Sequence, residues 1–237
     1  MTGIRSKSTL GLATLLLILL PCRLPASPGE TGPGTERIGK AIEAIQEMAG
    51  LDEVGLPSKI LRECHGIAVI PGVIKAAWGI GGQYGRGILC VRNEDGGWSA
   101  PSFISLVGGS LGWQIGVEKA DIILVFKTRK SIDNIAMGKV TLGADLSVAA
   151  GPVGRSAEAS TDIDLNAEIY SYSKSKGWFA GVSVKGASIQ IDKDANAAFY
   201  GVAKIAAREI LYGRDIRTPG VVDDLKKALE KITSRKI

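Results

Sequence analysis

One stretch of the sequence, residues 66–127, constrains the fold more than any other. It alternates β-branched and aromatic residues with glycines, as in the run GIAVIPGVIKAAWGIGGQYGRGILCV. Glycine weakens an ordinary strand, so repeated glycines indicate a bulge, a tight bend or a close approach between backbones. The stretch therefore predicts a strongly curved, predominantly antiparallel β core that is barrel-like in its curvature.

Helices are expected on both sides of this core in the sequence. Ile38, Ile42, Ile45 and Met48 recur at helical spacing, and a similar apolar face recurs in residues 221–232. Shorter helices are predicted over 57–64, 131–137 and 203–211, the second with Ser131 as its N-cap. We expect an α+β fold with one domain over residues 36–237, preceded by a flexible linker at 27–35.

The first 26 residues have the features of a signal peptide. Arg5 and Lys7 precede an apolar run at 10–20 that is too short to span a bilayer, and Ala26 closes a small-residue cleavage site. We expect export to the periplasm or the cell envelope. Removing the leader's three basic residues lowers the net charge from +5 to +2, so the charge gives little reason to expect nucleic-acid binding.

Cys22 offers a second route of processing. In a bacterial lipoprotein this cysteine would be acylated and would become the new N-terminus. Pro21, however, occupies the position where such a signal has a small residue. Simple export is the favoured interpretation, and a lipid anchor on Cys22 remains the alternative.

The remaining cysteines and the one histidine do not point to a metal or a disulfide framework. Cys64 and Cys90 stand in apolar surroundings, which favours buried, unpaired side chains. His65 is the only histidine, so a site with several histidine ligands is excluded. We expect no metal and no cofactor.

Two motifs are typical of enzymes with a dinucleotide cofactor. Gly81, Gly85 and Gly87 have the glycine spacing of short-chain dehydrogenases, and Tyr170 and Lys174 have the spacing of their catalytic pair. That glycine motif must open a helix, whereas Gly87 is followed by the β-prone run ILCVRNEDGG. We therefore expect no enzyme. An uncharacterised hydrolase is kept as a remote alternative, which would need Tyr170, Lys174 and an acidic group in one cleft.

A calcium-loop motif also fails. Asp192, Asp194 and Asn196 match the first ligands of an EF-hand, but Ala197 and Ala203 replace its glycine and its glutamate. The two aspartates are expected instead to end a strand and to cap the next segment.

Basic residues provide the candidate binding site. Lys127, Arg129 and Lys130 cluster at the end of a predicted strand, and Arg86 and Arg92 share a face if 85–92 is a regular strand. Such groups can bind phosphates, or they can simply cap exposed parts of a sheet.

Several ordered segments resemble one family. The run GLPSKILRECHGIAVIPGVIKAAWGIGGQYGRGILC and the later segments LGADLSVAAGPVGRSAEA, EIYSYSKSKGWFAGVSVKG and DANAAFYG are similar to the SYLF domain family. Eukaryotic members bind membranes, notably phosphoinositides, and some bind and bundle actin. Bacterial members are commonly exported proteins or lipoproteins that consist of this domain alone.

The resemblance implies a non-enzymatic lipid-binding or membrane-associated module in the cell envelope. We expect anionic phospholipid headgroups to bind at five residues: Arg86, Arg92, Lys127, Arg129 and Lys130. The alternative is an envelope scaffold that binds another protein. Actin binding is not expected of an exported protein.

Overall fold

The computed structural model describes residues 31–49, 56–78, 80–110, 116–153, 167–175, 177–214 and 216–234. The predicted signal peptide, Cys22 and residues 27–30 of the predicted linker lie outside this part of the chain.

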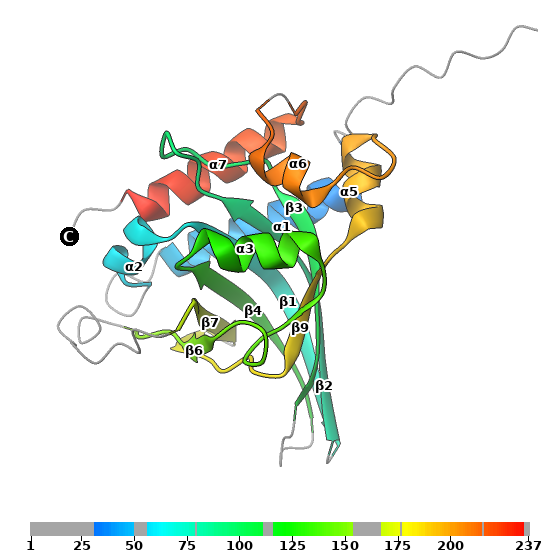
Figure 1. The fold of residues 1–237 in the computed structure, drawn as a ribbon. Coiled ribbons are helices and arrows are strands. Elements are labelled where there is room, and N and C mark those ends of the chain that lie inside the picture. Colours follow the sequence, from blue (N-terminus) through cyan, green and yellow to red (C-terminus); the bar gives the residue numbers. More distant parts are fainter. Residues whose placement is uncertain are drawn as a thin grey trace, which may run out of the picture.

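A curled, nine-stranded sheet forms the centre of the molecule (Figure 1). Its strands are β1 (Gly66–Trp78), β2 (Ile80–Val91), β3 (Ser102–Ser110), β4 (Gly116–Phe126), β5 (Val140–Thr141), β6 (Val148–Ala150), β7 (Ile169–Ser175), β8 (Trp178–Gly181) and β9 (Ala187–Ile191). Their order is β5-β9-β3-β2-β1-β4-β7-β6, with β8 paired to β7. All the pairs of these described strands are antiparallel except β6 with β7, so the expected antiparallel, strongly curved core is confirmed.

Glycines on β2 allow the sheet to curl. A Cβ placed on Gly85 would lie 2.7 Å from Cγ2 of both Ile70 and Val73, and one on Gly87 would lie 2.2 Å from the Val69 carbonyl oxygen. Only glycine fits where neighbouring strands approach this closely. The register of β1 also shifts near Gly72, whose φ of 60° is easily adopted by glycine. The glycines thus provide curvature, as their spacing predicts.

Six described helices cover the two faces of the sheet. They are α1 (Pro33–Ala49), α2 (Ser58–Glu63), α3 (Arg129–Met137), α5 (Lys193–Tyr200), α6 (Ala207–Tyr212) and α7 (Gly220–Thr233). Ile38 and Ile45 of α1 and Leu225 of α7 belong to one apolar cluster with β-strand residues. Ile132 of α3 and Leu211 of α6 belong to a second cluster on the other face.

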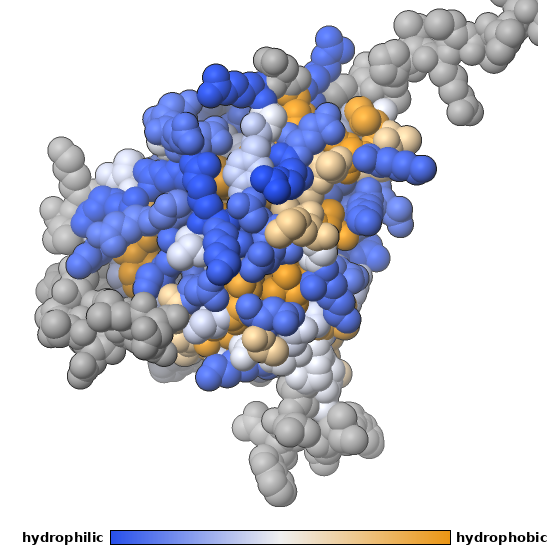
Figure 2. Space-filling view, viewed as in Figure 1, coloured by the Kyte–Doolittle hydropathy of each residue, from blue (hydrophilic) through white to orange (hydrophobic). Residues whose placement is uncertain are grey.

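The α3 face of the molecule is largely hydrophilic, and its apolar surface is divided into separate areas (Figure 2). None of the described helices has both the length and the apolar character that crossing a membrane requires.

Several boundaries differ from those expected from the sequence. Helix α1 begins at Pro33, inside the predicted linker, because proline suits the first turn of a helix. Thr128, and not Ser131, is the N-cap of α3, since its hydroxyl accepts from the Ser131 amide. Gly138 ends that helix, as the glycine directly after the predicted helix 131–137 leads one to expect.

The short elements of the C-terminal half were predicted less well. The segments 140–150 and 178–191 are each rich in β-branched and small residues, which predicts one strand region apiece, but each holds two short strands. Helix α5 was not predicted, although Asp192 was expected to cap the segment after it, and it does so by accepting from the Ala195 amide. Within the predicted β core, a further strand is expected from the pattern over 110–117, and this segment lies largely outside the described residues.

Candidate functional site

Three neighbouring strands bring basic residues together at one end of the sheet. Strand β1 lies between β2 and β4, and Gly66 at its start pairs with Val91 and Phe126. The His65 amide donates to the Phe126 carbonyl and the His65 carbonyl accepts from the Arg92 amide, both at 2.8 Å. Arg92, His65 and Lys127 therefore follow one another across the ends of three strands.

Helix α3 adds two further cations to this end. Its first turn carries Arg129 and Lys130 directly after β4. The Arg129 guanidinium donates to the Arg92 carbonyl at 3.1 Å, which fixes the helix against the end of β2. We call the set Arg92, Lys127, Arg129 and Lys130 the basic end.

The members of the basic end differ in how strongly the fold holds them. The Arg92 guanidinium donates to the carbonyls of Leu61 at 3.4 Å and Arg62 at 2.8 Å, and it lies 5.9 Å from the Trp98 ring centroid. The Lys127 ammonium lies 5.4 Å from the centroid of the Tyr170 ring. Lys130 is exposed. Arg92 thus helps to hold α2 on the sheet, whereas Lys130 is open to a ligand.

Arg86 lies apart from the other four predicted residues. It shares a face with Arg92, as strand alternation predicts, but six residues of strand separate their Cα atoms by about 20 Å. Arg86 is exposed beside α1, and its Nε donates to the Tyr84 hydroxyl at 2.6 Å. The structure therefore divides the five predicted residues between two surfaces.

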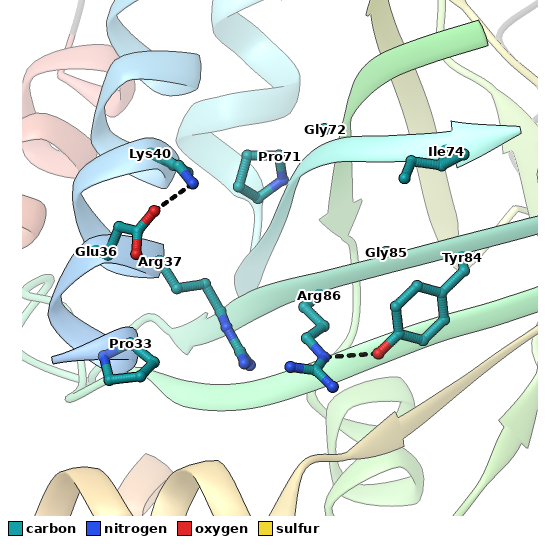
Figure 3. Close-up of a pocket in the computed structure, with 10 residues that line it drawn as sticks. All are labelled: Pro33, Glu36, Arg37, Lys40, Pro71, Gly72, Ile74, Tyr84, Gly85 and Arg86. Carbon is teal, nitrogen blue, oxygen red and sulfur yellow. Dashed lines mark hydrogen bonds and ion pairs between the residues drawn. The ribbon is translucent and has the colours of Figure 1, made fainter. Parts of the chain in front are cut away.

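The sequence did not predict the site in which Arg86 takes part. A cavity of about 290 Å³ lies between the start of α1 and strands β1 and β2, and Arg37, Lys40 and Arg86 all line it (Figure 3). The polar positions of α1 were visible in the sequence. That these residues lie close to Arg86 of β2 could not be predicted, because it depends on how the helix packs on the sheet.

The pairings on α1 set the charge of this cavity. Lys40 donates to the Glu36 carboxylate at 2.5 Å, and this hydrogen bond lowers the pKa of Glu36. Arg37 forms an ion pair with Asp192 at 3.0 Å, and Asp192 lies at the start of α5. Arg86 forms no ion pair with any residue that the structure describes.

The dehydrogenase-like motifs do not have the geometry that the cofactor chemistry needs. Gly81, Gly85 and Gly87 lie within β2, and no helix follows them before β3 in this described stretch. Tyr170 and Lys174 lie on β7, four strand residues or about 13 Å apart, whereas the catalytic pair must lie close together. Lys174 instead forms an ion pair with Glu47 of α1.

The two described cysteines are buried, and the described cysteine, histidine and acidic side chains do not gather into a metal site. Cys64 and Cys90 are buried and unpaired, as predicted, and burial raises the pKa of each thiol to about 12. Among the described residues no group of three or more histidine, cysteine or acidic side chains is placed to hold a metal ion.

These features define a mixed α+β domain with a glycine-rich, curled antiparallel sheet and two basic surface sites. The model of the Ysc84 family, described as "Las17-binding protein actin regulator", matches residues 107–232, which is more than half of the chain. The chain belongs to this family, the SYLF domain family that its motifs resemble.

Similar proteins come from fungi and vertebrates. "LAS seventeen-binding protein 3" of Saccharomyces cerevisiae is 41% identical over 187 residues, which are 78% of this chain and 40% of that protein. "Protein YSC84" of the same species is 37% identical over 202 residues, 83% of this chain and 42% of that protein. "SH3 domain-containing YSC84-like protein 1" of Xenopus laevis is 35% identical over 200 residues, 84% and 59% respectively. The chain thus spans about two fifths of the length of the yeast relatives.

Proposed function

We propose that the protein is a non-enzymatic, membrane-associated module of the cell envelope that binds anionic lipid headgroups at the basic end. The observation that carries this proposal is the meeting of Arg92, Lys127 and Arg129 where three central strands end, with Lys130 exposed beside them. Each basic side chain near an anionic membrane contributes about 1 kcal/mol of attraction. A cluster of four on one end therefore favours a membrane surface as the ligand.

The predicted export of the chain supports this assignment. A protein released from its leader into the envelope of a bacterium meets membrane surfaces that carry anionic phospholipids. If Cys22 were acylated instead, the anchor would hold the protein at the membrane permanently, and the basic end would then orient it. Both routes place the same surface near lipid headgroups.

A vesicle sedimentation assay tests the proposal. The chain 27–237 would be mixed with vesicles of phosphatidylcholine alone or of phosphatidylcholine with phosphatidylglycerol. We expect pelleting with the anionic vesicles only, and an affinity about tenfold lower for Lys130→Glu, because the substitution replaces attraction by repulsion. Equal, negligible pelleting with both vesicle types would rule the proposal out.

A matched control separates the basic end from overall charge. Lys193 is exposed in the first turn of α5, away from the basic end, so Lys193→Glu changes the net charge by the same amount. We expect this variant to pellet like the unsubstituted protein. A loss equal to that of Lys130→Glu would mean that net charge, and not the basic end, governs binding.

A second candidate function is the binding of another protein. One yeast relative is named for binding LAS seventeen, and the description of the family also names Las17 binding, which favours a protein partner for this fold. Salt distinguishes the two candidates: headgroup binding through exposed cations weakens steeply with ionic strength, whereas an apolar protein contact persists.

A further inference from the structure

An exposed apolar stripe crosses the sheet beside α1. Ile74 of β1 pairs with Tyr84 of β2, and Tyr84 pairs with Val107 of β3, so the three side chains stand side by side on one face. They are 48%, 45% and 44% exposed. Val117 of β4, opposite Ala76 in the next row, is 75% exposed and extends the stripe.

Helix α1 forms a wall along this stripe. The cavity in the corner is lined by Pro33 and Arg37 of the helix and by Ile74 and Tyr84 of the strands, which places helix and stripe on the same face (Figure 3). A helix is about 10 Å across, so α1 stands well above the strands. The surface therefore has the shape of a step: the stripe of Ile74, Tyr84, Val107 and Val117 is its floor, and α1 is its side.

Cations border the floor on two sides. The Arg86 guanidinium lies at its α1 side and is held by the Tyr84 hydroxyl. Lys119 is directly opposite Ile74 on β4, and its Cε lies 2.8 Å from the position of a Cβ on Gly72. Neither has an ion-pair partner in the part of the chain that the structure describes. The rim thus carries positive charge that no acidic side chain there offsets by direct pairing.

We propose that this step is a docking site for an acidic amphipathic helix of a partner protein. The apolar face of the helix packs on Ile74, Tyr84 and Val107, and its acidic flank faces Arg86 and Lys119. A helix lying beside α1 at the usual interaxial distance of about 8–10 Å continues the helical layer that already covers this face. The proposal goes beyond lipid binding and gives the protein-binding alternative a defined surface.

The same geometry argues against two other occupants. A bilayer is flat on this scale, so it would rest on α1 and leave the floor of the step uncovered. A second copy bound face to face would bring Arg86 and Lys119 onto a surface that already carries the same cations, and like charges across an interface oppose association.

Fluorescence anisotropy with a synthetic probe tests the proposal. The probe is a labelled helix of about 18 residues with leucine along one face and glutamate on both flanks, and its partner probe has lysine in place of every glutamate. We expect the glutamate probe to bind at least about tenfold more tightly than the lysine probe. Arg86→Glu should reverse this preference, a result that simple loss of structure cannot produce. Ile74→Ser should weaken both probes.

Two control variants distinguish this site from the basic end. Val202 is 47% exposed outside the stripe, so Val202→Ser should leave probe binding unchanged. Lys130→Glu should lower vesicle binding and leave probe binding unchanged. Arg86→Glu should leave vesicle binding unchanged and weaken binding of the glutamate probe. Equal binding of the two probes would overturn the proposal, as would loss of vesicle binding in both Arg86→Glu and Ile74→Ser. A dimer that Ile74→Ser dissociates would overturn it in favour of a second copy.

Discussion

The Arg37 guanidinium donates to the Asp192 carboxylate across 3.0 Å and so joins α1 to the start of α5. The other carboxylate oxygen accepts from the Ala195 amide at 3.1 Å and caps α5. Arg37 also lies 5.1 Å from the ring centroid of Phe103 on β3. The Arg37–Asp192 pair therefore fixes α1, α5 and β3 relative to one another, and it holds α1 in place beside the proposed docking site.

Asp192 makes two separable contributions to the stability of the fold, the N-cap of α5 and the ion pair with Arg37, and replacing it should remove them. Asp192→Ala removes both the cap and the ion pair, so we expect the free energy of unfolding to fall by about 2 kcal/mol. Asp192→Asn keeps an oxygen for the Ala195 amide and should lose about half as much. Urea denaturation followed by circular dichroism measures both changes.

Asp194 provides the control for this prediction. It carries the same carboxylate two residues later, is exposed, and lies in the first turn of α5 without capping it. Asp194→Ala should change the free energy of unfolding by less than about 0.5 kcal/mol. Equal losses for Asp192→Ala and Asp194→Ala would show that the joint between α1 and α5 contributes nothing of its own.

Gly85→Val should damage the folded state. The new Cβ would stand 2.7 Å from methyl groups of Ile70 and Val73, and both of these side chains are buried. Overpacking of this kind costs about 1–3 kcal/mol, and the strand backbone has little room to move away. A lower midpoint in thermal unfolding is the expected result.

Gly82 is the matched glycine on the same strand. It is exposed, and a Cβ there would meet nothing nearer than the Gly108 carbonyl oxygen at 3.9 Å. Gly82→Val should therefore leave the midpoint nearly unchanged, because valine suits a strand. If Gly85→Val also left it unchanged, the glycines of β2 would not be what permits the curl.

Local pattern was enough to predict that residues 66–127 form strands in a curved sheet, but not where each strand begins and ends: strands predicted at 66–70, 76–84 and 85–92 are two longer strands, 66–78 and 80–91. The alternation of apolar residues with glycine has the two-residue period of a strand, and repeated glycine indicates close backbones. The pairing of β1 with β4 could not be predicted in the same way, because β2 and β3 separate them in the chain. Helix α5 was missed since its eight residues include Asn196, which helices disfavour, and its stability comes from packing.

The five basic residues predicted to bind anionic headgroups show the same limit. Strand alternation correctly placed Arg86 and Arg92 on one face, but it carried no information on the helices that cover that face. Arg92 lies at the end of the strand under α2, whereas Arg86 lies beside α1. The sequence thus grouped five residues that the tertiary structure separates between two surfaces.

Arg92 should contribute to stability more than Lys130 does. The Arg92 guanidinium donates to two carbonyls at the end of α2, so Arg92→Ala leaves the Leu61 and Arg62 carbonyls without this donor. We expect a loss of about 1–3 kcal/mol in the free energy of unfolding, because hydrogen bonds to charged groups are strong. Lys130→Ala should be neutral within about 0.5 kcal/mol. Equal effects in urea denaturation would contradict this division.

The buried thiols should be unreactive in the folded protein. Burial raises the pKa of Cys64 and of Cys90 to about 12, so neither is a thiolate at pH 8. We expect the chain 27–237 to react slowly with a disulfide reagent when native and to release two equivalents in guanidinium, without prior reduction. Prompt labelling of the native protein, or no labelling after unfolding, would show an exposed thiol or a disulfide.

The same pKa shifts predict how stability depends on pH. From the ordinary thiol pKa of 9.0 up to about 12, the unfolded chain loses these protons while the folded chain keeps them. Unfolding is then favoured by rising pH, so the thiols' contribution to stability is complete below pH 9 and is lost as pH approaches 12. Replacing both cysteines by alanine should make the decline in unfolding free energy over this range shallower. An unchanged decline in the double variant would mean that other groups cause it.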